Sequence, residues 1–350
     1  DREELERELG EPGPERIWYV GDAFENGFTL EEVHALTHID PWFLAQIEDI
    51  VGIEMALDDM SLAEVDAVTA KLRAEVEAFD PELIVIFAPD HYNGLFYDLM
   101  PPFVIATAAD GVGDYQSLAG PLSIPRDLAM QLTRFILDSD VDIALSHRLQ
   151  VDHGCTQTLE EMTGAIDRYP VIPIIVNSVA PPFAPYRRVR KLGEAVGRFL
   201  ATLNKRVLIL GTGGLSHEPP VPLLDNAPEA IAEFLIAGRN PTAEARAARQ
   251  ARTIAAGKIY GTELSQQTPL NADWDLAFVD LLVNGRLDEI DEFRIEEISR
   301  AAGRSAHEVR TWVAAFSALA ATGAYTARLD YYRAINEWIA GYGVVSAEQA

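Results

Sequence analysis

ELIVIFAPDHYNG, residues 82–94, is the stretch of this 350-residue chain that most clearly indicates its fold. Residues 83–87 form a continuous apolar run rich in β-branched side chains, which is typical of a strand buried on both faces of a sheet. Pro89 ends the strand, because proline has no N–H to donate to a neighbouring strand. Asp90 and His91 follow its carboxyl end, where open α/β sheets bind ligands. They are candidate site residues; the alternative is a capping aspartate beside a surface histidine.

The rest of the chain alternates between similar apolar runs and amphipathic segments. We expect further strands over residues 103–107, 142–149, 171–176 and 206–210, and helices over residues 60–79, 126–138, 156–166 and 189–203. The glycine-spaced stretch 111–120 reads as a loop, and residues 223–345 as mostly helical. This alternation predicts an α/β fold, a three-layer α/β/α sandwich.

The beginning of the chain has a different pattern, which predicts a small helical N-terminal segment. Residues 15–26 have helical spacing, and Thr29-Leu-Glu-Glu32 is a capping box for a second short helix. Asp40-Pro41 is a typical start for a third helix. We therefore expect two domains, a short helical segment over residues 1–56 and the main domain over residues 57–350.

Composition excludes several classes of partner. Lys and Arg number 28 against 55 Asp and Glu, a formal charge of −27, which repels nucleic acid and anionic membrane. No apolar run reaches the roughly 18 residues that a membrane span needs, and no basic-then-apolar signal segment opens the sequence. The single cysteine, Cys155, excludes an internal disulfide framework and favours a reducing cytoplasm. We expect a cytoplasmic protein that binds neither nucleic acid nor membrane.

Three of the seven histidines, His91, His153 and His217, follow predicted strands through Asp-containing or Gly-rich turns. Because strand ends converge at one edge of a sheet, we expect the three side chains to meet. Neutral imidazole is a common metal ligand, and two His with one carboxylate is the ligand set of non-heme Fe(II) oxygenases. The alternative is that strand ends simply favour polar turn residues.

Other chemistries remain open on the residues alone. Histidine also serves in acid–base catalysis without a metal. Ser216 beside His217 suggests a serine hydrolase, but the chain has no GxSxG motif. The chain also lacks HExxH and a cysteine cluster, which argues against the zinc sites known by motif, and GTGG at residues 211–214 lacks the GK[ST] ending of a phosphate loop.

Five blocks of the sequence resemble the class III extradiol ring-cleavage dioxygenases of the LigB superfamily. The blocks are APDHYNGLFYDLMPPF (88–103), QVDHGCTQTLE (150–160), LNKRVLILGTGGLSHEPPVP (203–222), AHEVRTWVAAF (306–316) and YYRAINEWIAG (331–341). The resemblance runs from about residue 58 to the end of the chain. It implies an oxidoreductase of aromatic catabolism that uses O2 to open the ring of a small catecholic acid, such as 2,3-dihydroxyphenylpropionate, beside its diol.

The resemblance also implies roles for individual residues. The family holds one Fe(II) through two His and one Glu, and two of these ligand positions fall on His91 and Glu308. Glu308 precedes Trp312 by four residues, on a helix where both share a face; by itself it reads as a solvated helical carboxylate. The acid–base histidines of the family fall on His153 and His217. We further expect a homo-oligomer.

A carboxylate on the substrate needs a cation in the site. The candidates are Arg187, Arg188 and Arg190, because PYRRVR is a rare basic cluster in this acidic chain. The alternative is a solvated helix face.

The sequence departs from the family pattern at its start. There the family has a strand ending in an SHSP-like element, which supplies the first iron-ligating His; here that position falls near Glu48. PERIWYVGDAFENGFTLEEVHALTHIDPWFLAQIEDIV instead resembles a helical segment of the carbamoyl-phosphate synthase large chain, from which we carry over no activity. His38, in LTHID, echoes the missing motif about ten residues too far upstream.

Two rival functions remain beside this dioxygenase. One is a non-catalytic paralogue or fusion scaffold with an incomplete iron site. The other is a metal-dependent hydrolase or a carbamoyl-phosphate-linked enzyme, and the absence of nucleotide-binding motifs counts against the latter.

Overall fold

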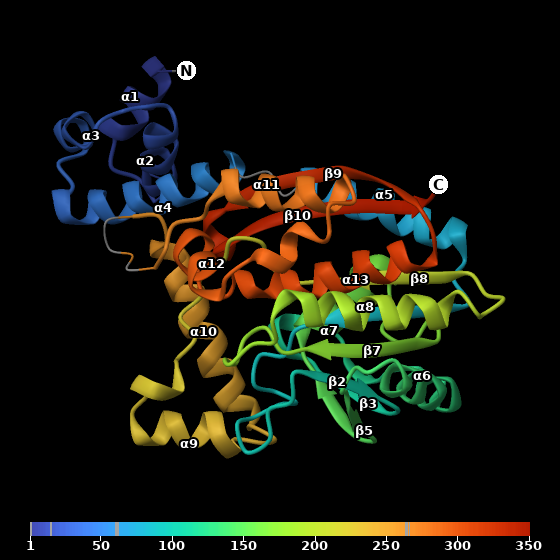
Figure 1. Cartoon of the computed structure of the whole chain (residues 1–350). Coiled ribbons are helices and arrows are strands. Elements are labelled where there is room, and N and C mark those ends of the chain that lie inside the picture. Colours follow the sequence, from blue (N-terminus) through green and yellow to red (C-terminus); the bar gives the residue numbers. More distant parts are fainter. Residues whose placement is uncertain (1, 15, 60–62, 263–264, 266) are drawn as a thin grey trace. The chain divides into compact units, whose positions relative to one another are not determined.

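The computed structural model describes residues 2–14, 16–59, 63–262, 265 and 267–350 (Figure 1). The chain forms two compact units, Asp1–Ala67 and Val68–Ala350. The division after residue 56, which rests on sequence resemblance, stays a prediction. Among the described residues, no helix has both the length and the apolar character needed to cross a bilayer.

The first unit consists of short helices, as the capping signals predict. It contains α1 (Arg2–Gly10), α2 (Arg16–Glu25), α3 (Leu30–Thr37) and α4 (Pro41–Asp59). The capping box is formed, because the Thr29 hydroxyl accepts a hydrogen bond from Glu32 N and Thr29 N donates to the Glu32 carboxylate. Asp40 caps α4 by accepting from Trp42 N at 2.9 Å. The helices enclose their own apolar core, which includes Leu9, Val20, Ala23, Val33 and Leu44.

A five-stranded mixed sheet forms the centre of the second unit. Its strands are β1 (Leu83–Ala88), β2 (Phe103–Ala106), β5 (Ala144–Ser146), β7 (Val171–Val176) and β8 (Val207–Gly211), in the order β5-β2-β7-β1-β8. β1 is parallel to both of its neighbours, β7 and β8, whereas β2 runs antiparallel to β7. Every residue of β1 and β7 is buried, so the strand predicted over residues 83–87 lies inside the sheet.

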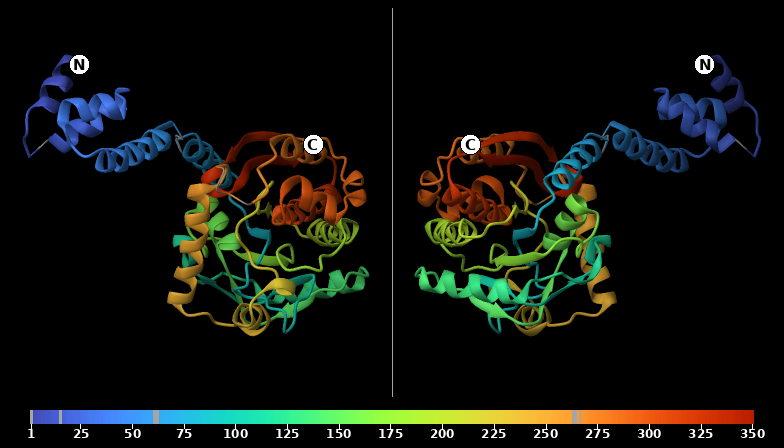
Figure 2. Two further views of the ribbon diagram at one scale, coloured as in Figure 1. Left: turned by 90° about the vertical axis from the view of Figure 1, so that its left-hand side faces the viewer. Right: turned by 90° about the vertical axis from the view of Figure 1, so that its right-hand side faces the viewer.

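Helices cover both faces of this sheet, which gives the predicted α/β sandwich (Figures 1 and 2). On β1, Leu83, Val85 and Phe87 face a core shared with α6 (Arg126–Asp138), α8 (Tyr186–Leu200) and α13 (Val309–Thr322). Ile84 and Ile86 face the opposite core, shared with α7 (His153–Thr163). The period of two along the strand therefore separates two helical layers.

A smaller sheet supplements the second layer and corrects two expectations. The strand expected over residues 142–149 is divided into β5, in the main sheet, and β6 (Leu149–Val151), in a three-stranded sheet of order β4-β3-β6. The stretch expected as a loop, residues 111–120, contains the second half of β3 (Ala109–Val112), the 3-10 turn η1 (Asp114–Gln116) and the start of β4 (Ala119–Pro121). Glycines hide such short strands, because they weaken the apolar alternation that signals a strand.

Contacts of α5 and α8 support this framework. α5 (Ala63–Phe79) leads into β1, and its Arg73 donates to the carbonyl oxygens of Glu160 and Glu161 at 3.1 and 2.8 Å. Residues 60–62, where this helix was expected to begin, lie outside the described part of the chain. α8 approaches α13 very closely, since a Cβ at Gly197 would lie 2.0 Å from Ala318 O.

The carboxyl-terminal region is less helical than expected. It contains α9 (Glu229–Ala237), α10 (Ala243–Ile259), α11 (Ala272–Val283), α12 (Ile295–Ala302) and α13, but then an antiparallel hairpin of β9 (Tyr325–Ile335) and β10 (Ala340–Gln349). The prediction of helix beyond residue 324 is therefore wrong. Tyr, Thr and Val in this stretch favour strands, and that preference prevails over the helical spacing.

One edge of the main sheet is formed by the apolar strand β8. All five of its residues are only half-buried, although its sequence, VLILG, has the continuous apolar character of an interior strand. In the described part of the chain, β1 is the only strand paired with it. An open apolar edge is uncommon in native proteins, because its unpaired backbone groups invite another strand.

Candidate metal and catalytic site

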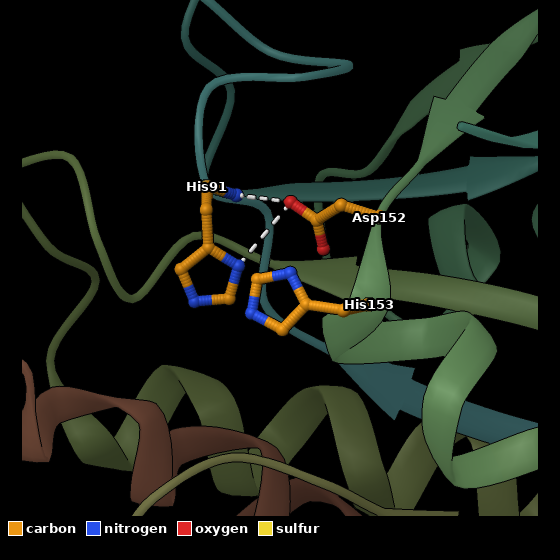
Figure 3. A group of neighbouring side chains, drawn as sticks. All are labelled: His91, Asp152 and His153. Atoms are coloured by element: carbon orange, nitrogen blue, oxygen red, sulfur yellow. Dashed lines mark hydrogen bonds and ion pairs between the residues drawn. The ribbon is translucent and has the colours of Figure 1, made fainter. Parts of the chain in front are cut away.

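The structure brings His153 and Glu308 into contact with His91. The rings of His91 and His153 stack with their centroids 4.6 Å apart (Figure 3). His91 Nε2 lies 3.2 Å from Glu308 Oε1. His217 lies near them, since its charge and that of Glu308 influence each other's pKa. The expected convergence of the three histidines is therefore observed, although His153 follows β6 of the smaller sheet.

His91 is fixed by a carboxylate on each side of its ring. Its backbone N donates to Asp152 Oδ2 at 2.7 Å, and its Nδ1 lies 3.2 Å from the same oxygen (Figure 3). This contact leaves Nε2 pointing at Glu308. Burial by itself would lower the pKa of His91, but the charge and hydrogen bond of Asp152, together with Glu308, raise it well above its ordinary value.

Asp152 is the N-cap of α7 and is fully buried. Besides His91, it accepts hydrogen bonds from Asn93 Nδ2 at 3.0 Å and Gly154 N at 3.1 Å. Its pKa is lowered, because the charge and hydrogen bonds of His91 and the charge of His153 outweigh the effect of burial. Asp152 therefore stays ionised and orients His91.

Glu308 ends the 3-10 turn η4 (Ala306–Glu308), directly before α13. Its side chain is 5% exposed, and its Oε2 accepts from Gly214 N at 2.9 Å. Burial would raise the pKa of Glu308, but the hydrogen bond from His91, the charges of His91 and His217 and the Gly214 N–H lower it to about 2. Trp312 Nε1 donates to Gly213 O at 2.9 Å, so Glu308 and Trp312 both hold the loop after β8.

His153 has a carboxylate partner of its own, Asp114 of η1. Asp114 accepts from His153 N and contacts His153 Nδ1, both at 2.7 Å. The next residue, Tyr115, places its ring 4.6 Å from that of His153. Asp114 is buried and lies 39 residues earlier in the chain, so sequence spacing gave no sign of this pair.

His217 is held by backbone rather than by a carboxylate. Its Nδ1 lies 2.5 Å from Ile339 O, in the turn between β9 and β10. Burial lowers the pKa of His217 against the opposing charge of Glu308 and the hydrogen bond to Ile339. The ring is therefore kept neutral, with Nδ1 as the donor and Nε2 free to accept a proton.

The preceding residue, Ser216, fastens the His217 loop to a buried aspartate. Asp275 Oδ1 accepts from Ser216 N at 2.6 Å, and Oδ2 accepts from the hydroxyls of Ser216 and Tyr332 at 2.7 and 2.8 Å. Ser216 is fully buried and its hydroxyl is bound to Asp275 rather than to His217. This geometry does not form the Ser–His pair of a serine hydrolase.

Each of the three histidines lies beside a residue with a strained backbone. Tyr92 follows His91 with φ of 55°, Tyr115 packs on His153 with φ of 47°, and Ile339 accepts from His217 with φ of 55°. A β-branched residue such as Ile339 is rarely found in this left-handed region. Such strain collects at functional sites, where the surroundings hold it in place.

The donor atoms fit a divalent metal in part. Imidazole Nε2 of His91 and carboxylate Oε1 of Glu308 face each other, and the Nδ1 contact to Asp152 is the usual support for a ligating histidine. His91, Asp152 and His153 also lie within 4.8 Å of one another, but Asp152 is already saturated with N–H donors. Among the described residues, no third acidic, His or Cys ligand atom joins the pair of His91 and Glu308 within that distance.

The remaining candidate residues have other surroundings. His38 ends α3 in the first unit, with an exposed side chain. Arg190 is bound to Asp291 at 2.5 Å and also to Glu194, and Arg188 lies 3.7 Å from Asp142. Of the suggested arginine cluster, these two side chains serve surface ion pairs of α8, as the alternative of a solvated helix face predicts.

Comparison with known families agrees with this geometry. The family described as the catalytic LigB subunit of aromatic ring-opening dioxygenase matches residues 53–343. The carbamoyl-phosphate synthetase large chain oligomerisation domain matches residues 1–77. The two matches overlap over residues 53–77, which spans the end of α4 and most of α5.

Individual relatives share more than half of their aligned residues with this chain. A protein of Azotobacter vinelandii named 2,3-dihydroxyphenylpropionate/2,3-dihydroxicinnamic acid 1,2-dioxygenase is 83% identical over 288 residues, which are 82% of this chain and 92% of that protein. Proteins of the same name from Xanthobacter autotrophicus and Cupriavidus necator are 80% and 58% identical, covering 82% and 83% of this chain and 92% of each relative.

A solved structure of an uncharacterized Escherichia coli protein aligns with a TM-score of 0.43 at 13% identity, over 79% of this chain and 91% of that one. The family match and the sequence relatives carry the assignment: the chain belongs to the LigB family of aromatic ring-opening dioxygenases.

Proposed function

We propose that this protein is a non-heme Fe(II) extradiol dioxygenase that opens the ring of 2,3-dihydroxyphenylpropionate or a related catechol with O2. The relatives' names supply the substrate class. The observation that carries the proposal is the position of His91, held between Asp152 and Glu308 with His153 stacked on its ring. This arrangement supports a site in which metal donors and proton-transfer groups lie side by side.

His91, through Nε2, and Glu308 would hold the iron. When bound, Fe(II) supplies the Lewis acidity that favours the catecholate form of the substrate and a redox partner for O2. Asp152 keeps the His91 ring oriented, and the Gly214 N–H keeps the Glu308 carboxylate oriented.

The other two histidines would move protons. His217 donates through Nδ1 to a backbone carbonyl, so its Nε2 presents a lone pair that suits removal of a proton from a catechol hydroxyl. His153 contacts Asp114 through Nδ1, which orients the ring and leaves Nε2 to deliver a proton. Their different hydrogen-bond partners support one base and one acid.

The test is anaerobic reconstitution of the full chain with Fe(II), followed by 3-(2,3-dihydroxyphenyl)propionate in air. We expect oxygen uptake together with the yellow, ring-opened product. The iron-free protein serves as the control. Iron-loaded protein that consumes no oxygen and forms no coloured product contradicts the proposal.

A second candidate is a non-catalytic fusion scaffold with an incomplete iron site. Two observations favour it: the open edge of β8 and the pairing of only two convergent donors, His91 and Glu308, among the described residues. In this case the protein should lose iron on desalting, whereas an active enzyme retains it. Iron content therefore separates the two candidates before any assay of turnover.

The setting and assembly of the protein are also proposals. A buried free thiol, Cys155, suits the reducing cytoplasm. The oligomerisation domain that matches residues 1–77 supports a homo-oligomer. We propose that the helical segment over residues 1–56 binds its counterpart in another copy of the chain and so joins copies of the dioxygenase domain over residues 57–350. A monomeric mass in sedimentation analysis contradicts this assembly.

A further inference from the structure

Helix α10 lies across the site at the carboxyl ends of the strands. Figure 1 shows it beyond the arrowhead of β7, and Figure 2 shows it running along that side of the unit. It packs against η1, which holds Asp114 and Tyr115 beside His153, and against η5 (Asn336–Trp338), which precedes Ile339. A Cβ at Gly257 would lie 2.4 Å from Glu337 O, so the contact with η5 is tight. α10 therefore spans the site from the His153 side to the His217 side.

One arginine of α10, Arg249, fastens the helix to the loop of His91. Its Nη1 donates to His91 O at 3.2 Å and to Tyr92 O at 3.3 Å, and its Nη2 donates to Asn93 Oδ1 at 2.9 Å. These bonds engage both terminal nitrogens in holding the loop. They also show which face of α10 is turned toward the site.

Arg246 lies on the same face, three residues before Arg249, because positions i and i+3 of a helix are neighbours. Its Nε is buried and has no hydrogen-bond partner among the described residues, and none of the ion pairs between those residues includes it. A buried donor without a partner is costly, so its persistence requires an explanation. By contrast Arg252, on the same helix, is exposed to solvent.

We propose that Arg246 binds the carboxylate on the substrate's side chain. The guanidinium fork matches a carboxylate in geometry and charge, and a bound carboxylate would satisfy the free Nε–H. The substrate class is then a catechol with a carboxylate-ended chain beside the diol, the chain reaching toward α10. This inference rests on the proposed function and replaces Arg188 and Arg190 of α8 as the anchor, since both are paired there with acidic side chains.

The test measures binding rather than turnover, so it does not depend on iron. Calorimetry compares 3-phenylpropionate with its neutral analogue 3-phenylpropanamide on the full chain. The wild type should prefer the acid. Arg246→Gln should weaken binding of the acid by about 10- to 100-fold, as expected for loss of a charge-assisted hydrogen bond, and leave the amide unchanged. Arg246→Lys should keep most of the preference, and Arg252→Gln, the matched control, should keep all of it.

Three results would overturn the inference: a wild type without preference for the acid, an Arg246→Gln variant with full preference, or an equal loss for both ligands, which indicates a structural role. Turnover of 3-methylcatechol by the iron-loaded protein tests the proposed function separately. If the wild type opens no catechol, the proposed function fails while the binding comparison still decides the role of Arg246.

Discussion

Two corners of the site use the same residue type in opposite ways. In the His91 corner (His91, Asp152 and Glu308), the ring is held between two carboxylates and its pKa is raised. In the His217 corner (His217, Ser216 and Asp275), the ring meets a backbone carbonyl, the carboxylate is one residue removed, and the pKa is lowered. Both histidines follow a strand of one sheet. The contrast teaches that the hydrogen-bond partners, rather than topological position, divide the proposed roles of metal ligand and proton acceptor.

The largest effect should come from removing a donor in the His91 corner. We expect Glu308→Gln to weaken Fe(II) binding by more than about 100-fold, because loss of a ligand costs more than the roughly 10- to 100-fold of losing a ligand's hydrogen-bond partner. Anaerobic dialysis against ferrous iron, followed by iron analysis, measures it. Retention of wild-type affinity would remove Glu308 from the metal site.

Changes of the proton-transfer histidines should stop turnover without releasing iron. His217→Ala or His153→Ala should lower kcat by on the order of 100- to 10,000-fold, the usual contribution of a positioned acid or base. Oxygen uptake by the iron-loaded variants gives the rate, and circular dichroism verifies the fold. If a variant keeps a rate close to that of the wild type, the histidine that it lacks does not have the proposed role in proton transfer.

Asp275→Asn sharpens the comparison, because it alters the His217 corner without changing the His217 side chain itself. The amide can accept from Ser216 N but cannot accept from both the Ser216 and Tyr332 hydroxyls at its second position, so the loop should loosen. We expect kcat to fall by about 10-fold, less than the loss of the general base itself because His217 is still present, with iron binding unchanged. Equal losses of iron binding and turnover would show that the corners are not separable.

The smallest effect concerns the pH dependence of stability at Glu218, which adjoins the His217 corner. Glu218, the next residue, contacts Arg304 Nε at 2.5 Å and accepts from Thr268 N at 3.0 Å. Burial opposes ionisation, but the hydrogen bonds of Thr268 and Arg304 lower the pKa of Glu218 below its ordinary value of 4.5. Its ionised form therefore stabilises the fold above pH 4.5, and this contribution is lost as the pH falls below that value.

Replacing Glu218 by Gln should accordingly cost about 1 kcal/mol at pH 7, since the arginine is partly exposed. Denaturant unfolding at several pH values measures the difference between wild type and variant. The difference should shrink as the pH falls below 4.5. A difference that is constant over this range would show that Glu218 acts through packing alone.

The fold was predictable wherever strands are buried on both faces. Continuous apolar runs identified β1 and β7, because only interior strands need such sequences. The β3–β4 hairpin was not predictable from glycine-rich residues, and the β9–β10 hairpin competed with a helical spacing that its tertiary setting overrides. The local sequence predicts a strand reliably only where the strand is also buried between neighbouring strands.

The site was predictable in its histidines and less so in their partners. His91, His153 and His217 follow strand ends, and the sequence alone placed them together. Asp152 is the partner of His91, and the only sequence signal for it was its position directly before His153, another predicted site residue. Asp114 left no signal, because a bond across 39 residues depends on how the smaller sheet folds. Glu308 was found through family resemblance, since a lone helical carboxylate has no distinctive pattern.

The division between the two corners is tested most directly by the iron content of two variants, His91→Ala and His217→Ala, loaded anaerobically with Fe(II) in parallel with the wild type and desalted. If the wild type retains stoichiometric iron, the account predicts that His217→Ala retains as much and that His91→Ala retains almost none. Equal retention by the two variants, or loss of iron from His217→Ala alone, would contradict the assignment of metal binding to the His91 corner.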